Sequence, residues 1–350
     1  MINKTAQLLT EHIKKYPQLE IRDILKYLYQ SSFGCEHMIS SKHRAYEYLV
    51  REYSNTKPIK PPYTEPLDGD YSRVSLGVIG EGMSIKTLSE MFYMSAKKEK
   101  NGYDTLKNKL NIAQNMIKEG ILPFCDNEFN KECAEWANNG YPAIHHSEKF
   151  RKLYNPSYRV ISNKYIPLIP IVTKIDLALS KGNAVVAIDG RCASGKTTMC
   201  KLLHDIYNCN VFHTDDYFLR PGQRTPERLA QPGGNMDRER FMQEILIPVS
   251  LEKDVVYRAY DCSKGMLREA TTKKHSRLTI VEGAYSMHPD LQKYYNITVF
   301  SDISPQLQKE RILNRNPHIA DRFFNQWIPM ENTYIENFDI KNQCDLYINN

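Results

Sequence analysis

The sequence contains no long apolar run. Its longest apolar stretch, residues 165–172, includes two prolines and ends before Lys174, whereas a membrane-spanning helix needs roughly 20 apolar residues. The N-terminal residues reach Glu11, Lys14 and Lys15 without the apolar core or the small-residue cleavage site of a secretory signal. We therefore expect a cytoplasmic protein with no membrane partner.

Paired cysteine and histidine motifs are also missing. The eight cysteines are scattered without a C-x-x-C pair, and no H-x-x-x-H occurs. These absences exclude a zinc cluster of the usual spacing. Reduced thiols are the expected state of the cysteines.

A strong excess of one charge is absent as well. Residues 1–165 hold 24 Lys and Arg against 19 Asp and Glu, and residues 166–350 hold 23 against 22. A dedicated nucleic-acid-binding protein carries a far more basic surface. We therefore do not expect nucleic acid as the main partner, and the sequence leaves the oligomeric state open.

The length and composition indicate two globular domains. The chain has 350 residues, of which 41% are apolar and 25% charged, and one hydrophobic core seldom organises so long a chain. Apolar residues recur at helical spacing before the proline-containing segment 154–170, where we place the boundary. We expect a mainly α-helical domain of unknown role over 1–165 and a second domain over 166–350.

The second domain alternates short β-branched runs with helical patterns. The runs lie at 184–188, 211–218, 255–260, 278–281, 297–300 and 346–348, and helical patterns lie between several of them, from about residues 196, 238, 304 and 323. This alternation predicts an α/β fold in which helices flank a parallel sheet.

Residues 190–197 complete the pattern G-x-x-x-x-G-K-[ST] between an apolar run and a helical pattern. Glycines let successive backbone amides point into one hollow, where the N-terminus of the following helix adds positive charge. A triphosphate fits such a hollow, Lys196 would reach its β and γ phosphates, and Thr197 would hold Mg²⁺. The expected ATP-binding residues are Gly190, Arg191, Cys192, Ala193, Ser194, Gly195, Lys196, Thr197 and Thr198.

Carboxylates follow two of the other predicted strands. Asp215 and Asp216 end the run from Val211, and Glu282 follows residues 278–281; ligands of open α/β sheets bind at this edge. One aspartate would accept the proton of an attacking hydroxyl while Glu282 arranges magnesium. Neighbouring strand residues point to opposite faces, and we favour Asp215 as the base, with Asp216 as the alternative. The alternative is that these acidic residues have no catalytic role and lie in solvent-exposed turns.

These residues together resemble the phosphoribulokinase/uridine kinase family of P-loop kinases, over about residues 183–350. Residues 189–198 are similar to that family's phosphate loop, 214–218 to its strand-two aspartate with following aromatics, and 256–261 to the segment that lines its nucleoside pocket. The resemblance implies a kinase domain that uses ATP and Mg²⁺, has Asp215 as its base and phosphorylates a nucleoside such as uridine. The expected acceptor-binding residues are Asp216, Tyr217, Arg224, Arg228, Asn235, Tyr260, Asp261 and Tyr285.

The acceptor region departs from the family pattern. Residues 220–237 form a longer, arginine-rich element, and Arg258 and Ala259 replace a proline-containing approach to Tyr260. Guanidinium groups suit a phosphate or carboxylate on the acceptor, although surface arginines also simply coat loops. A phosphorylated sugar or a pantothenate-like acid is therefore an alternative acceptor, and a non-catalytic ATP-sensing or RNA-associated module is an alternative function.

Two further arginines are candidates for catalysis. Arg311 and Arg315 lie one turn apart on a helix predicted to begin at Ser304. In kinases of this class such a pair belongs to a lid that neutralises the transferring phosphoryl group. The alternative is that Arg311 and Arg315 lie on a solvent-exposed helix face and have no catalytic role.

The first domain resembles no family that we identify. Residues 32–37 are expected to end a helix at Gly34 and to expose Cys35 and His37, and His145 and His146 lie in another turn. A nucleophilic Cys/His pair is conceivable, but a structural role is the preferred interpretation. We expect this domain to modulate or supplement the kinase.

Overall fold

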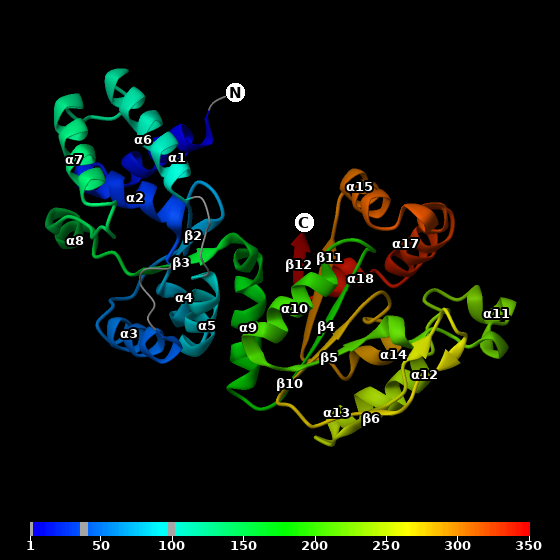
Figure 1. Ribbon diagram of the computed structural model, residues 1–350. Helices are drawn as coiled ribbons and strands as arrows, with labels where there is room; N and C mark the ends of the chain where they lie inside the picture. Colours follow the sequence, from blue (N-terminus) through cyan, green and yellow to red (C-terminus); the bar gives the residue numbers. More distant parts are fainter. Residues whose placement is uncertain (1–2, 36–40, 97–101) are drawn as a thin grey trace. The chain divides into compact units, whose positions relative to one another are not determined.

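The computed structural model describes residues 3–35, 41–96 and 102–350. The chain divides into two compact units, residues 1–169 and 170–350, and this division lies four residues beyond the boundary expected from the sequence. Figure 1 shows the two units. Within the described ranges, no helix is both long and apolar enough to cross a membrane.

The first unit combines helices with a small sheet that the helical periodicity did not predict. An antiparallel sheet has the order β1-β2-β3, with β1 at Thr64–Pro66, β2 at Tyr71–Ser75 and β3 at Tyr158–Ser162. Strand β3 lies in the proline-containing segment that looked like a linker, and its partner β2 is far away in the sequence. The helices are α1 (Lys4–Lys15), α2 (Ile21–Phe33), α3 (Lys42–Ser54), α4 (Gly77–Gly80), α5 (Ile85–Ser95), α6 (Gly102–Lys118), α7 (Asp126–Asn138) and α8 (Glu148–Tyr154).

The expectation that Cys35 is exposed was wrong. Its side chain is completely buried, and burial raises the pKa of its thiol to about 12. A thiol that stays protonated is a poor nucleophile. His37, its suggested partner, lies outside the described residues.

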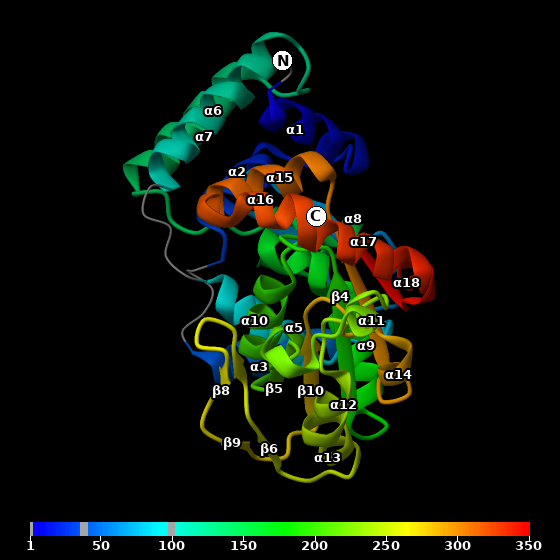
Figure 2. The ribbon, with the colours of Figure 1, turned by 90° about the vertical axis from the view of Figure 1, so that its right-hand side faces the viewer.

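The second unit confirms the predicted α/β fold. Five parallel strands have the order β12-β11-β4-β10-β5, and every residue of β4 and β10 is buried because these strands lie inside the sheet. Figure 2 shows the same elements from the side. The strands are β4 (Ala184–Gly190), β5 (Asn210–His213), β10 (Leu278–Glu282), β11 (Ile297–Asp302) and β12 (Leu346–Asn349).

Helices flank this sheet, and two of the helical segments contain a π-helical turn. The π turns η5 (Met242–Leu246) and η7 (Phe323–Trp327) each end shortly before a proline, Pro248 or Pro329. Proline lacks the amide hydrogen that an α-helix uses, so the hydrogen-bond pattern of the helix changes locally at these positions. The other helices are α9 (Ile169–Leu179), α10 (Lys196–Tyr207), α11 (Pro226–Leu229), α12 (Arg238–Phe241), α13 (Ile247–Ser250), α14 (Pro289–Gln292), α15 (Pro305–Arg315), α16 (Ala320–Arg322), α17 (Ile328–Asn337) and α18 (Ile340–Gln343).

The run at 255–260 does not join the main sheet as predicted. It divides into β6 (Val255–Tyr257) and β7 (Tyr260–Asp261), which pair with β9 (Thr271–Lys273) and β8 (Met266–Leu267) in two separate antiparallel ribbons. A short turn joins β7 to β8, whereas β6 and β9 lie on either side of that ribbon in the sequence.

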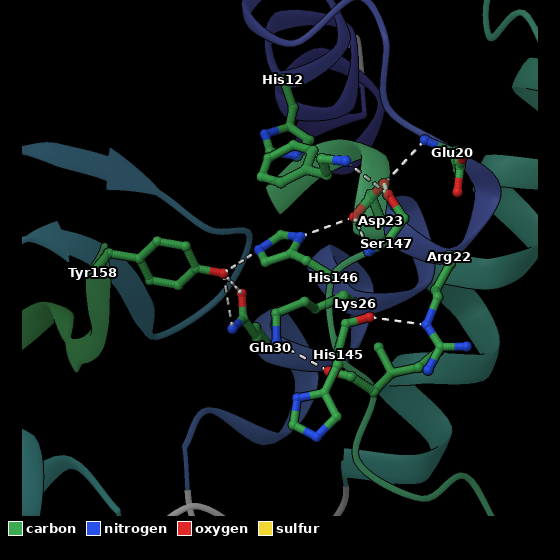
Figure 3. A network of polar contacts seen from close by, with 12 residues as sticks. His12, Glu20, Arg22, Asp23, Lys26, Gln30, His145, His146, Ser147 and Tyr158 are labelled. Carbon is green, nitrogen blue, oxygen red and sulfur yellow. Dashed lines mark hydrogen bonds and ion pairs between the residues drawn. The ribbon is translucent and has the colours of Figure 1, made fainter. Parts of the chain in front are cut away.

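A buried polar network organises the first unit (Figure 3). Asp23 of α2 accepts hydrogen bonds from Nδ1 of His146 (2.9 Å), from the amide and hydroxyl of Ser147, and from the Glu20 amide. Burial alone would raise the pKa of Asp23, but these hydrogen bonds outweigh it and lower the pKa to about 2. Burial lowers the pKa of His146 to about 4. At neutral pH, His146 is therefore uncharged and Asp23 is ionised.

Acid should destabilise this unit. The pKa of His146 is 6.5 in the unfolded chain and about 4 in the folded protein. The pKa of Asp23 is 3.8 in the unfolded chain and about 2 in the folded protein. The unfolded state thus gains protons first, and the free energy of unfolding decreases by on the order of 2 kcal/mol between pH 6.5 and 4 through His146 alone. Trp136 fluorescence in a Trp327→Phe background reports this unit in urea titrations.

His146→Gln is the matched variant for that measurement. It should unfold at lower urea concentration at pH 7 and show a shallower loss of stability between pH 6.5 and 4. An identical pH dependence in both proteins would contradict the role given to His146.

Candidate phosphate-binding and acceptor site

The loop after β4 requires glycine at its first position. Gly190 has a φ of +139°, and a Cβ there would lie 1.9 Å from the carbonyl oxygen of Ser301 on β11. Gly195, with a φ of +98°, precedes α10 as its N-cap without any side-chain cap. These two positions therefore favour glycine, and α10 begins with its backbone amides uncovered.

The amides at the start of α10 have no partner in the described structure. No described residue accepts a hydrogen bond from the amides of Gly195, Lys196, Thr197 or Thr198. Unpaired amides and the partial positive charge of a helix N-terminus together attract phosphate. One neighbouring amide, that of Cys192, already donates to Oε2 of Glu331 at 2.9 Å.

Lys196 lies inside the curve of the loop. It is only 9% exposed, and its ammonium donates to the carbonyl oxygens of Gly190 (2.7 Å) and Arg191 (2.9 Å). The loop thus holds a positive charge next to the open amides. That arrangement suits the β and γ phosphates of a nucleotide.

The structure brings Thr197 and Glu282 together. The Thr197 hydroxyl donates to Oε1 of Glu282 at 3.2 Å, and no described residue donates to Oε2. The same Oε1 accepts from Nδ1 of His213 at 2.6 Å, and this hydrogen bond is the main cause that raises the pKa of His213. His213 was not predicted from the sequence; it is the last residue of β5, and Asp215 follows in the 3-10 turn Thr214–Tyr217, so strand alternation does not link the two.

Asp215 and Asp216 have different surroundings. Burial raises the pKa of Asp215, and the largest charge effect opposing it comes from the ammonium of Lys196. Burial also raises the pKa of Asp216, against the opposing charges of His213 and Arg268. Neither carboxylate accepts a hydrogen bond from the described residues, but only Asp215 has Lys196 among the charges that act on its pKa.

Asn235 and Tyr285 form the part of the acceptor region with an unsatisfied polar atom. Oδ1 of Asn235 is buried and has no partner among the described residues. Burial raises the pKa of Tyr285, the charge of Glu331 adds to this effect, and the Asn235 side chain opposes it. Because buried polar atoms are nearly always paired, Oδ1 marks a place where a ligand donor fits.

Other expected acceptor residues are held by the protein itself. The Tyr217 hydroxyl donates to Glu244, and the Arg240 guanidinium lies over its ring. Tyr260 is buried in its ribbon. The Asp261 carboxylate accepts from Ser263 and pairs with Arg268.

The arginine-rich element is also largely bound internally. Both terminal nitrogens of Arg228 donate to Glu239 at 2.8 Å, and Nε and Nη2 also donate to the carbonyl oxygens of Gly234 and Met236. Arg224 donates through Nε to the Leu219 carbonyl and keeps its terminal nitrogens unbound by the described residues. Arg228 therefore fixes the loop.

Helix α15 places one arginine on the phosphate loop. The Arg311 guanidinium donates to the carbonyl oxygen of Ala193 at 3.0 Å, whereas Arg315 is exposed and has no partner in the described part of the chain. The sequence predicted the pair but not this difference.

Three residues of α17 contact the loop and were not predicted. Glu331 accepts from the Cys192 amide, Asn332 is hydrogen-bonded to Arg191, and the Tyr334 hydroxyl donates to Asp189 at 2.8 Å. Burial raises the pKa of Glu331. No local motif signals these contacts, because α17 reaches the loop through tertiary packing.

Gly190→Ala should destabilise the second unit by at least about 2 kcal/mol, since the new methyl group meets the Ser301 carbonyl. Urea unfolding followed by Trp327 fluorescence in a Trp136→Phe background measures the effect. Gly222→Ala is the control, because a Cβ at Gly222 meets nothing within 4 Å. Equal stability of the two variants would contradict the close approach of the loop to β11.

Comparisons with known proteins find similarity in structure only. No family model and no curated protein matches the chain. A possible uridine kinase from Bacillus stearothermophilus is 18% identical and covers 51% of this chain and 99% of its own, with a TM-score of 0.37. A putative fructose transport system kinase from Silicibacter is 18% identical over 47% and 89% of the two chains, with a TM-score of 0.34. TT1252 from Thermus thermophilus is 15% identical over 48% and 89%, with a TM-score of 0.28. At these scores the function has to be argued from the site itself.

Proposed function

We propose that this protein transfers the γ-phosphoryl group of ATP to a hydroxyl group of a small molecule, with a nucleoside as the favoured acceptor. The observation that carries the proposal is the Asp215 carboxylate, which has no hydrogen-bond partner among the described residues and lies within the electrostatic reach of Lys196. A carboxylate so placed beside open phosphate-loop amides matches the needs of phosphoryl transfer.

Each of the site residues has its own role in the proposed reaction. Asp215 accepts the proton of the acceptor hydroxyl while that oxygen forms a bond to the γ phosphorus and the bond to ADP breaks. The amides from Gly195 to Thr198 and the Lys196 ammonium hold the phosphates. Arg311, which already contacts the loop, adds positive charge where the phosphoryl group moves.

The donor set also fits Mg²⁺. Thr197 supplies a hydroxyl and Glu282 a carboxylate with one unengaged oxygen, and Mg²⁺ prefers a few such oxygen ligands together with phosphate and water. The described residues contain no group of three or more His, Cys, Asp or Glu side chains fit for a metal. Magnesium bound here would neutralise charge on the phosphates.

The acceptor side favours an uncharged molecule with hydrogen-bond donors. Oδ1 of Asn235 is buried and unpaired in the described structure, so a hydroxyl or N–H of the acceptor would satisfy it. Four of the five N–H groups of Arg228 are bound inside the protein, which leaves one for an acceptor phosphate. The unpaired Oδ1 of Asn235 therefore supports a nucleoside, and the terminal nitrogens of Arg224, unbound by the described residues, keep a phosphorylated or acidic acceptor as the alternative.

Asp215→Asn should lower acceptor-stimulated ADP formation by about 100-fold or more, since the amide cannot accept the proton. A panel of nucleosides, sugars and sugar phosphates with Mg·ATP gives the rates. Asp216→Asn is the matched control and should keep most of the activity. Equal rates for Asp215→Asn and wild type would remove Asp215 from the mechanism, and ATP binding without any acceptor stimulation would favour the sensing module.

Arg311→Gln should reduce kcat more than Arg315→Gln does, because only Arg311 contacts the loop. A loss of about tenfold or more is expected for Arg311→Gln, in line with one charged contact to the reacting group. Steady-state kinetics with the best acceptor of the panel measures both variants. A larger defect in Arg315→Gln would reverse the assignment.

A further inference from the structure

The first unit contains a cavity that the proposed kinase reaction does not use. Its volume is about 500 Å³, within the range of small-molecule sites. Lys26 and Gln30 of α2, His146, Arg151 of α8, and Tyr158 of β3 line it. Figure 3 shows several of these side chains and the network behind them.

One wall of the cavity is held by side chains that satisfy each other. His146 donates through Nδ1 to Asp23, so its Nε2 accepts from the Tyr158 hydroxyl at 2.7 Å. Oε1 of Gln30 accepts two hydrogen bonds from Arg73 (2.9 and 2.8 Å), which leaves its amide nitrogen to donate to the Tyr158 oxygen at 3.3 Å. This wall is therefore ordered without a ligand.

The cationic side chains of the cavity are not satisfied in the same way. Lys26 is 8% exposed, and its ammonium has one partner among the described residues, the Ile144 carbonyl at 2.9 Å. Arg151 lines the cavity and is exposed, and its guanidinium has no partner in the described part of the chain. Only Arg159, paired with Glu52 at 2.8 Å, has a counter-ion.

The charges that line the cavity thus leave an excess of two positive charges, since Lys26, Arg151 and Arg159 face one carboxylate, Glu52. Desolvation lowers the pKa of Lys26 to about 8, and repulsion from Arg73, Arg151 and Arg22 outweighs the opposing effect of Asp23. Gathering like charges around a buried ammonium is unfavourable unless an anion joins them.

We propose that this cavity binds the phosphate group of a small phosphorylated molecule, with Lys26 and Arg151 as its principal ligands. A phosphate dianion matches the excess charge and offers several acceptor oxygens to the unused N–H groups, whereas a carboxylate would neutralise only half of it. The size of the cavity and the mild basicity of this half of the sequence favour a small molecule over a nucleic acid.

Calorimetric titration of the full chain with glycerol 3-phosphate tests the proposal, with glycerol and inorganic phosphate as further probes. Glycerol 3-phosphate should bind and glycerol should not. Arg151→Gln should weaken the affinity about tenfold or more, and Lys26→Met should weaken it further, as expected for lost charge-assisted hydrogen bonds. If inorganic phosphate binds more tightly than glycerol 3-phosphate, the ligand of the cavity is free phosphate and not a phosphate ester.

The phosphate loop of the second unit is the competing site, and Lys196→Ala separates the two. Glycerol 3-phosphate binding that survives Lys196→Ala and is lost in Arg151→Gln supports the cavity, while the opposite pattern overturns the proposal. Lys118→Gln, an exposed residue at the end of α6, is the control and should bind as wild type does. Arg151 is exposed, so its variant remains informative even where Lys26→Met fails to fold. Binding of a single-stranded RNA alone, sensitive to Arg151→Gln, would also overturn the proposal.

Discussion

The contact between the backbone of Gly190 and the carbonyl of Ser301 is the constraint on which the candidate active site depends. Strand β11 lies directly beside β4 in the sheet, and the missing side chain lets the loop turn away from β4 at once. This turn sets the position at which α10 begins. Because α10 starts there, its first amides lie open at the carboxyl edge of the sheet, where β5 and β10 deliver Asp215 and Glu282.

The electrostatics of the site follow from that placement. A parallel sheet gathers the ends of its strands along one edge, so the acidic residues from two strands lie near the lysine and the amides from a third. His213 and Glu282 bind each other, and Lys196 binds the loop carbonyls. Asp215 is left without a hydrogen bond from the described residues. Asp216 likewise accepts none, but only Asp215 has Lys196 among the charges that act on its pKa, and Asp215 is the carboxylate that the proposed reaction needs.

The sequence was most informative where chemistry depends on neighbouring residues. Gly190 to Thr198 are consecutive, so their spacing alone predicted an anion hollow, and the strand ends of a parallel sheet indicated that Glu282 would lie near Thr197. Glu331 and Tyr334 could not be predicted because α17 reaches the loop only after the domain has folded. Strand β3 was missed for the same reason: its five residues form a strand only through pairing with β2, far away in the chain. The internal bonds of Arg228 likewise depend on Glu239, whose place no local pattern gives.

The central claim is that the amides from Gly195 to Thr198 bind the phosphates of ATP. Hydrogen exchange of the backbone amides in this segment, measured with and without saturating Mg·ATP, tests it directly. The account predicts markedly slower exchange at these positions when the nucleotide is present. Unchanged exchange in this segment, at a nucleotide concentration that slows exchange elsewhere in the chain, would contradict it.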